Sequence, residues 1–133
     1  MAKIKKILAT LLVTATLVGV MAVPTSAVTK NVPLKDVTYG GYNVSGTLSL
    51  TDYYVTANFT LSRIPNSSVV QINSTGITGT VYYSDSTGAT VQKNFSNTSK
   101  SLSCSASAPT DGITTKATAK YLVDGATIKE LTT

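Results

Sequence analysis

Apolar and polar residues alternate through most of the chain after its first 27 residues. The clearest case is the segment 53–62, where apolar side chains occupy every second position: Tyr53, Val55, Ala57, Phe59 and Leu61. Successive side chains of a β-strand point to opposite faces, so this pattern predicts a half-buried strand. The same alternation predicts strands over 43–50, 77–83, 89–95 and 101–108.

The C-terminal stretch 113–131 predicts a hairpin closed by Asp124-Gly125. Asp-Gly tolerates the positive φ angles that a type I′ turn requires. Pairing Val123 with Ala126 sets Tyr121 opposite Ile128, and the apolar face is then expected to comprise Ile113, Thr115, Ala117, Ala119, Tyr121, Val123, Ala126 and Ile128. Lysines 116, 120 and 129 fall on the other face. A hairpin with one apolar face needs a second sheet to cover it.

Turn signals separate the predicted strands at Gly40-Gly41, Pro65-Asn66, 84–88 and 109–112. A five-residue loop at 84–88 keeps the flanking apolar residues on one face and sets Tyr83 opposite Ala89.

About seven or eight short strands therefore predict an all-β fold, a single antiparallel β-sandwich of immunoglobulin- or fibronectin-like architecture. The Cys–Trp–Cys signature of antibody domains is absent, so the likeness is architectural; a jelly roll or a small closed barrel is the alternative.

Residues 1–27 have the layout of a secretory signal peptide. Lys3, Lys5 and Lys6 precede an uncharged apolar run, and small residues precede two possible cleavage points, after Ala22 or Ala27. The second is preferred because it lies just past Pro24. An uncleaved anchor is the alternative, although the run is at the short limit for crossing a bilayer. We therefore expect a secreted domain over 28–133 with no stable membrane anchor.

Charge and cysteine content narrow the class further. The chain has 11 basic and 6 acidic residues, and three of the lysines belong to the leader, which leaves a mature net charge of about +2. This is weak support for nucleic acid as a partner, and none is expected. Cys104 is the only cysteine, so no intrachain disulfide can form, and its inward position predicts a buried, inert thiol. A simple signal peptide followed by a domain without disulfides favours a Gram-positive bacterial source.

The sequence offers little catalytic chemistry. Histidine is absent, which removes the usual general base and the commonest zinc ligand. Asp85, Asp111 and Asp124 lie beside Gly or Ser in turns, where Asp accepts hydrogen bonds from nearby backbone. No spacing suggests a catalytic carboxylate pair or a calcium loop. We expect no enzyme activity, cofactor or bound metal.

Tyrosines are the best binding candidates in the sequence. Tyr39 and Tyr42 flank the double glycine, and Tyr54 and Tyr82 fall on Thr-rich outward faces. An exposed tyrosine offers a ring face and a hydroxyl to a sugar or a protein; alternatively, it covers its cross-strand neighbours.

The leading hypothesis is a small secreted, non-catalytic protein that acts by binding or surface display toward a cell-surface glycan or protein. A bacteriocin-like toxin or antimicrobial protein is the second hypothesis, and a hydrolase using Ser or Asp without His is the third.

Overall fold

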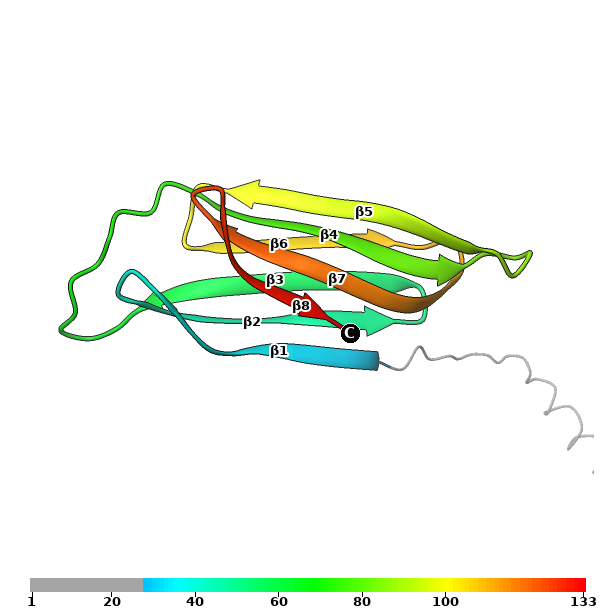
Figure 1. Cartoon of the computed structure of the whole chain (residues 1–133), viewed down its shortest axis with the longest axis horizontal. Helices are drawn as coiled ribbons and strands as arrows, with labels where there is room; N and C mark the ends of the chain where they lie inside the picture. The colour runs from blue at the N-terminus through cyan, green and yellow to red at the C-terminus, as the bar shows by residue number, and fades with distance from the viewer. Residues whose placement is uncertain (1–27) are drawn as a thin grey trace, which may run out of the picture.

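The computed structural model describes residues 28–133, which form eight strands in two four-stranded antiparallel sheets. The sheets lie face to face (Figure 1), which confirms the predicted β-sandwich. The predicted signal peptide lies outside the described residues. The 28–133 segment holds no helix long and apolar enough to cross a bilayer.

Each sheet has a simple order. Sheet 1 has the order β1-β2-β3-β6 and sheet 2 the order β5-β4-β7-β8. The strand bounds are β1 Val28–Tyr39, β2 Tyr42–Thr51, β3 Tyr54–Arg63, β4 Thr75–Ser84, β5 Thr90–Ser99, β6 Ser103–Pro109, β7 Ile113–Val123 and β8 Ala126–Thr132. If β1 is set aside, strands β2 to β8 can be lettered A, B, C, C′, E, F and G in chain order. Sheet 1 then has the order A-B-E and sheet 2 the order C′-C-F-G. This order is immunoglobulin-like, with β1 added beside strand A.

The two inner faces meet in one hydrophobic core, as the alternation predicts. Val55, Ala57 and Ile77 are fully buried. At the centre, the rings of Phe59 and Tyr121 pack edge to face with centroids 5.3 Å apart. Such pairs stabilise a fold beyond the area they bury. The Tyr121 hydroxyl also donates a hydrogen bond to the Thr47 carbonyl oxygen at 3.0 Å, so this side chain ties sheet 2 to sheet 1.

Two glycines make room for the core phenylalanines. Gly46 lies opposite Phe59 in the β2–β3 ladder, and Gly79 lies opposite Phe95 in the β4–β5 ladder. A Cβ on Gly79 would meet the Phe95 ring and the Thr118 carbonyl oxygen. The Phe95 ring therefore covers Gly79, and a larger residue there would displace it. A Cβ on Gly46 would instead meet the Asn58 carbonyl oxygen and the Cα and Cβ of Phe59.

The first part of β7 departs from the predicted pattern. The β4–β7 register shifts between Tyr82 and Tyr83, which face Lys116 and Thr114, so Thr115 is an extra residue. A bulge of this kind reverses the faces of the residues beyond it. Ile113 is therefore 54% exposed and Thr114 is buried, whereas the alternation predicts an inward Ile113 and Thr115.

The terminal hairpin is correct at its turn and wrong beyond it. Asp124 and Gly125 both have positive φ, and Val123 pairs with Ala126, as predicted. A register shift then sets Tyr121 opposite Lys129 instead of Ile128. Ala126, predicted to face inward, is exposed. The bulge leaves Ile128 partly buried against the core.

The β4–β5 loop has the predicted length in a different place. It spans five residues, 85–89, and Tyr83 faces Val91 instead of Ala89. The shift is by two residues, so the predicted inward faces of both strands are kept. Two further predictions were wrong. The alternation over 53–62 and 101–108 placed Tyr53 and Leu102 on inward faces, but Tyr53 lies just before β3 and Leu102 just before β6. Their side chains are 54% and 40% exposed.

Candidate functional site

The four tyrosines predicted to bind a ligand do not come together. Tyr39 and Tyr42 face each other across the β1–β2 hairpin; Tyr42 belongs to the core and Tyr39 is half-buried against it. Tyr54 lies on β3 of sheet 1 and Tyr82 on β4 of sheet 2. Their side chains face outward as predicted, and because the sheets are stacked, they lie on opposite faces of the sandwich.

Tyr54 and Tyr82 also differ in what they offer a ligand. Tyr54 is 43% exposed, and its hydroxyl oxygen lies 3.0 Å from Ser107 Oγ, so one edge of the ring is fixed. Tyr82 is half-buried, and the Lys116 ammonium lies 5.2 Å from its ring centroid, a cation–π contact. The Tyr82 ring therefore already has a partner, whereas the Tyr54 ring presents its surface to solvent.

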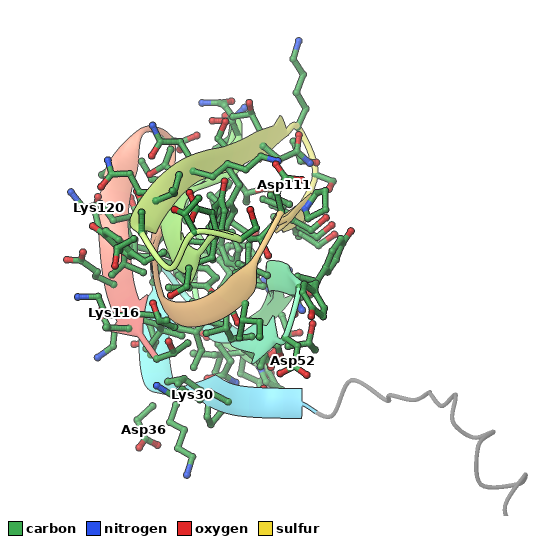
Figure 2. The ribbon with its side chains drawn as sticks, turned by 90° about the vertical axis from the view of Figure 1, so that its right-hand side faces the viewer. Lys30, Asp36, Asp52, Asp111, Lys116 and Lys120 are labelled. Atoms are coloured by element: carbon green, nitrogen blue, oxygen red, sulfur yellow. The ribbon has the colours of Figure 1, made fainter. Side chains whose placement is uncertain are left out.

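The strongest candidate site lies where three connections meet at one end of the sandwich. These are the β2–β3 turn (52–53), the β4–β5 loop (85–89) and the β6–β7 turn (110–112), and we call this part of the molecule the Tyr53 end. It is drawn at the right of Figure 1, and Figure 2 looks directly onto it.

Backbone contacts fix these connections to one another. The Thr110 N–H donates to the Tyr53 carbonyl oxygen at 3.0 Å, and the Thr114 N–H donates to the Asp52 carbonyl oxygen at 2.9 Å. Gly112 lies so close to Ser84 and Asp85 that a Cβ would meet their backbone. The three connections therefore form one frame.

Large apolar side chains are exposed on this frame. Of the six that are exposed in the described part of the chain, three lie here: Tyr53, Tyr54 and Ile113. Between the connections is a hollow of about 300 Å³ lined by Tyr53, Ser84, Asp85, Ser86, Asp111, Gly112 and Ile113. Exposed aromatic and aliphatic groups beside a hollow are typical of a binding site.

Carboxylates supply the polar part of this hollow. Oδ1 of Asp85 accepts hydrogen bonds from the Thr87 hydroxyl at 2.6 Å, the Thr87 N–H at 2.8 Å and the Ala89 N–H at 3.1 Å. These bonds, the Thr87 hydroxyl first, hold the pKa of Asp85 below its usual value. Oδ1 thus shapes the loop, as predicted for a turn aspartate, while Oδ2 receives none of these bonds.

The charged groups nearest the hollow are carboxylates. Figure 2 shows Asp52 and Asp111 on one side of this view and Lys116 on the opposite side, and Lys93 Nζ donates to the Pro109 carbonyl oxygen beside the β6–β7 turn at 2.9 Å. Asp111 is exposed and lines the hollow together with Asp85. A ligand in the hollow therefore meets carboxylates and no lysine among its lining residues.

A larger hollow of about 420 Å³ lies where β3 and β6 meet β5, and it is less suited to a ligand. Its polar groups already bond to one another: Asn97 Nδ2 donates to the Ser105 carbonyl oxygen at 2.7 Å, and Ser99 Oγ lies 2.8 Å from Ser101 Oγ. None of the large exposed apolar side chains lines it.

Other reactive groups are confined. Cys104 is buried, its Sγ donates to the Asn97 carbonyl oxygen at 3.6 Å, and burial raises the pKa of the thiol. No three side chains of His, Cys, Asp or Glu come together as metal ligands within residues 28–133.

Sequence reasoning overlooked Tyr53 and Ile113, since alternation placed both in the core. Tyr53 could have been found by reading Asp52-Tyr53 as the two-residue turn between β2 and β3. Ile113 could not, because no local sequence feature marks the bulge that exposes it. Comparison with protein families, curated proteins and solved structures found no match to this chain.

Proposed function

We propose that this protein is a secreted, non-catalytic binding module that contacts a neutral, hydroxyl-rich glycan at the Tyr53 end. The observation that carries the proposal is the exposure of Tyr53 and Ile113 in a hollow that also presents Asp85 and Asp111, with the exposed Tyr54 next to it on the outer face of sheet 1.

The chemistry of the hollow suits a sugar. A pyranose ring has an apolar C–H face and an edge of hydroxyl donors. Tyrosine rings cover the face, and carboxylate oxygens accept hydrogen bonds from the hydroxyls, which are stronger than bonds between neutral groups. An anionic glycan would meet repulsion from Asp85 and Asp111. The proposal is therefore for a neutral chain, such as a cell-wall polysaccharide.

The size and rigidity of the site indicate how the glycan would bind. A volume of about 300 Å³ is at the lower limit of small-molecule pockets, which suits one sugar unit or a chain end. The connections are held by the backbone bonds of Thr110 and Thr114, so little ordering is needed on binding. A rigid sandwich that carries binding groups on its connections is a common arrangement.

Co-sedimentation of the purified protein with insoluble neutral cell-wall polysaccharide tests the proposal. We expect Tyr53→Ala to weaken binding about tenfold or more, because it removes the ring and leaves the frame intact. Tyr82→Ala is the matched control, since it removes a tyrosine from the outer face of sheet 2 and should bind as the native protein does. Circular dichroism verifies that both variants are folded.

Two results would contradict the proposal. One is equal binding by the native protein and Tyr53→Ala; the other is a loss with Tyr82→Ala as large as that with Tyr53→Ala. Tyr54→Ala adds a second measurement: weaker binding by this variant would place part of the contact on the outer face of sheet 1.

A further inference from the structure

The four sheet edges are protected to different degrees. β1 and β6 are the edges of sheet 1, and β5 and β8 are those of sheet 2. An unprotected edge exposes backbone N–H and C=O groups that can pair with another strand, and natural proteins block edges with short strands, proline, charges or bulges.

Strands β1 and β8 carry such features. β1 contains Pro33 and a register shift between Leu34 and Val37, where Asp36 has a φ of +54°. β8 has only seven residues, a register shift at its start, and the charged pair Lys129-Glu130. A straight ladder with a second strand is disfavoured at both edges.

The edge of β6 is occupied by side chains. This strand also has seven residues. Its carbonyl oxygens accept hydrogen bonds at Ser103 from Ser101 Oγ at 2.9 Å, at Ser105 from Asn97 Nδ2 at 2.7 Å, and at Pro109 from Lys93 Nζ at 2.9 Å. Pro109 has no N–H to donate.

Strand β5 has none of these features. It has ten residues, contains no proline, and pairs with β4 without a register shift. Its only charged side chain, Lys93, is directed to the Pro109 carbonyl oxygen of β6. β5 is therefore the one long, regular and nearly uncharged edge among the four.

The groups that β5 leaves unpaired can be assigned from its ladder. The Asp85 N–H donates to the Ala89 carbonyl oxygen, and hydrogen-bonded pairs alternate along an antiparallel ladder. The odd-numbered residues of β5 therefore bond to β4, and the even-numbered ones turn their N–H and C=O groups away from it. All five of these have exposed side chains: Thr90, Gln92, Asn94, Ser96 and Thr98.

We propose that β5 pairs antiparallel with β5 of a second copy of this chain, about a two-fold axis at Asn94. The five outward residues are symmetric about Asn94. In this register Asn94 faces its own copy, Gln92 faces Ser96, and Thr90 faces Thr98, so every outward backbone group of both strands is paired.

A second copy suits this edge better than an unrelated strand. The register places uncharged polar side chains opposite one another, and two facing Asn94 amides can each donate and accept. The two Lys93 side chains become diagonal neighbours, but each ammonium is directed to the Pro109 carbonyl oxygen of its own chain. The two-fold axis places the 85–89 loops of the two copies at opposite ends of the dimer, so both Tyr53 ends stay accessible. The proposal goes beyond the binding function and does not rest on it.

Sedimentation analysis of protein recovered from the medium of an expressing host tests this pairing. We expect a reversible dimer for the native chain. Asn94→Pro should remain folded, because the Asn94 N–H does not bond to β4, yet its dimerisation should be weaker by tenfold or more. Asn94→Lys should act in the same way by placing two lysines at the axis. Thr127→Lys, an exposed position on β8 at the opposite edge of the same sheet, should dimerise like the native chain.

Disulfide trapping tests the position of the axis. In a Cys104→Ala background, Asn94→Cys places two thiols opposite each other, within reach of a disulfide, whereas two Thr90→Cys thiols would lie roughly 26 Å apart along the strands. Mild oxidation should cross-link the first variant alone. A native chain that stays monomeric at every concentration, an Asn94→Lys variant that dimerises like the native chain, or equal cross-linking at Thr90 and Asn94 would overturn the proposal.

Discussion

Replacing Tyr121 with phenylalanine tests the contact between the two sheets. The side chain is fully buried, and its hydroxyl donates to the Thr47 carbonyl oxygen of the opposite sheet at 3.0 Å. The substitution keeps the ring, and with it the edge-to-face packing on Phe59. It removes one hydrogen bond, so we expect a loss of about 1 kcal/mol from the free energy of unfolding at neutral pH.

The same hydroxyl makes this loss depend on pH. Burial raises the pKa of Tyr121 far above its usual value of 10.0. Above about pH 10 the unfolded chain releases this proton and the folded chain keeps it, so the stabilisation by Tyr121 is present below pH 10 and declines as pH rises. The decline is about 1.4 kcal/mol per pH unit. The stability difference between native protein and Tyr121→Phe should therefore close near pH 11.

Urea denaturation followed by circular dichroism at pH 7, 9, 10 and 11 measures this difference. Tyr54→Phe is the control, because its hydroxyl lies on the exposed face beside Ser107 and should contribute less than about 0.5 kcal/mol. A Tyr121→Phe variant as stable as the native protein at pH 7 would refute the inter-sheet hydrogen bond. A stability difference that stays constant up to pH 11 would refute the protonation argument.

Two further predictions concern the core. Gly79→Ala should lower the free energy of unfolding by about 1–3 kcal/mol, because its methyl group would displace the Phe95 ring. Gly76→Ala, in the same strand, should lower it less, because its methyl group meets its nearest atom, Thr98 Cγ2, at 3.3 Å. Thermal unfolding of both variants measures the difference. Cys104 should resist iodoacetamide at pH 8 in the folded protein and react in urea, because burial disfavours the thiolate; mass spectrometry would detect any native labelling that contradicts this.

The features that sequence predicted correctly are those that local pattern determines. Alternation identified the inward residues of β3 and β4, because one face of each is covered by the other sheet. Asp124-Gly125 fixed its own turn through the positive φ angles it tolerates. The five-residue length of the β4–β5 loop followed from the need to keep two apolar faces together, a condition that a shift by two residues still meets.

The wrong predictions have long-range causes. Thr114 is buried because its hydroxyl donates to the Thr51 carbonyl oxygen at 2.6 Å and its N–H donates to Asp52. Thr51 ends β2 of the other sheet and Asp52 lies in the turn that follows it, and both lie more than 60 positions earlier in the chain. Nothing in the sequence near residue 114 reports them, so a period-two reading continued the strand without the bulge at Thr115.

The candidate site depends on this same departure from alternation. If β7 were regular, Ile113 would lie in the core and Thr114 would face solvent, so the turn at Asp52-Tyr53 would lose its hydrogen bonds to β7. The bulge turns Ile113 outward and uses Thr114 to hold the turn that presents Tyr53. Departures from a local pattern are expected where a fold serves a function. This coincidence of bulge, turn and exposed apolar groups gives a physical reason for testing the Tyr53 end before any other surface.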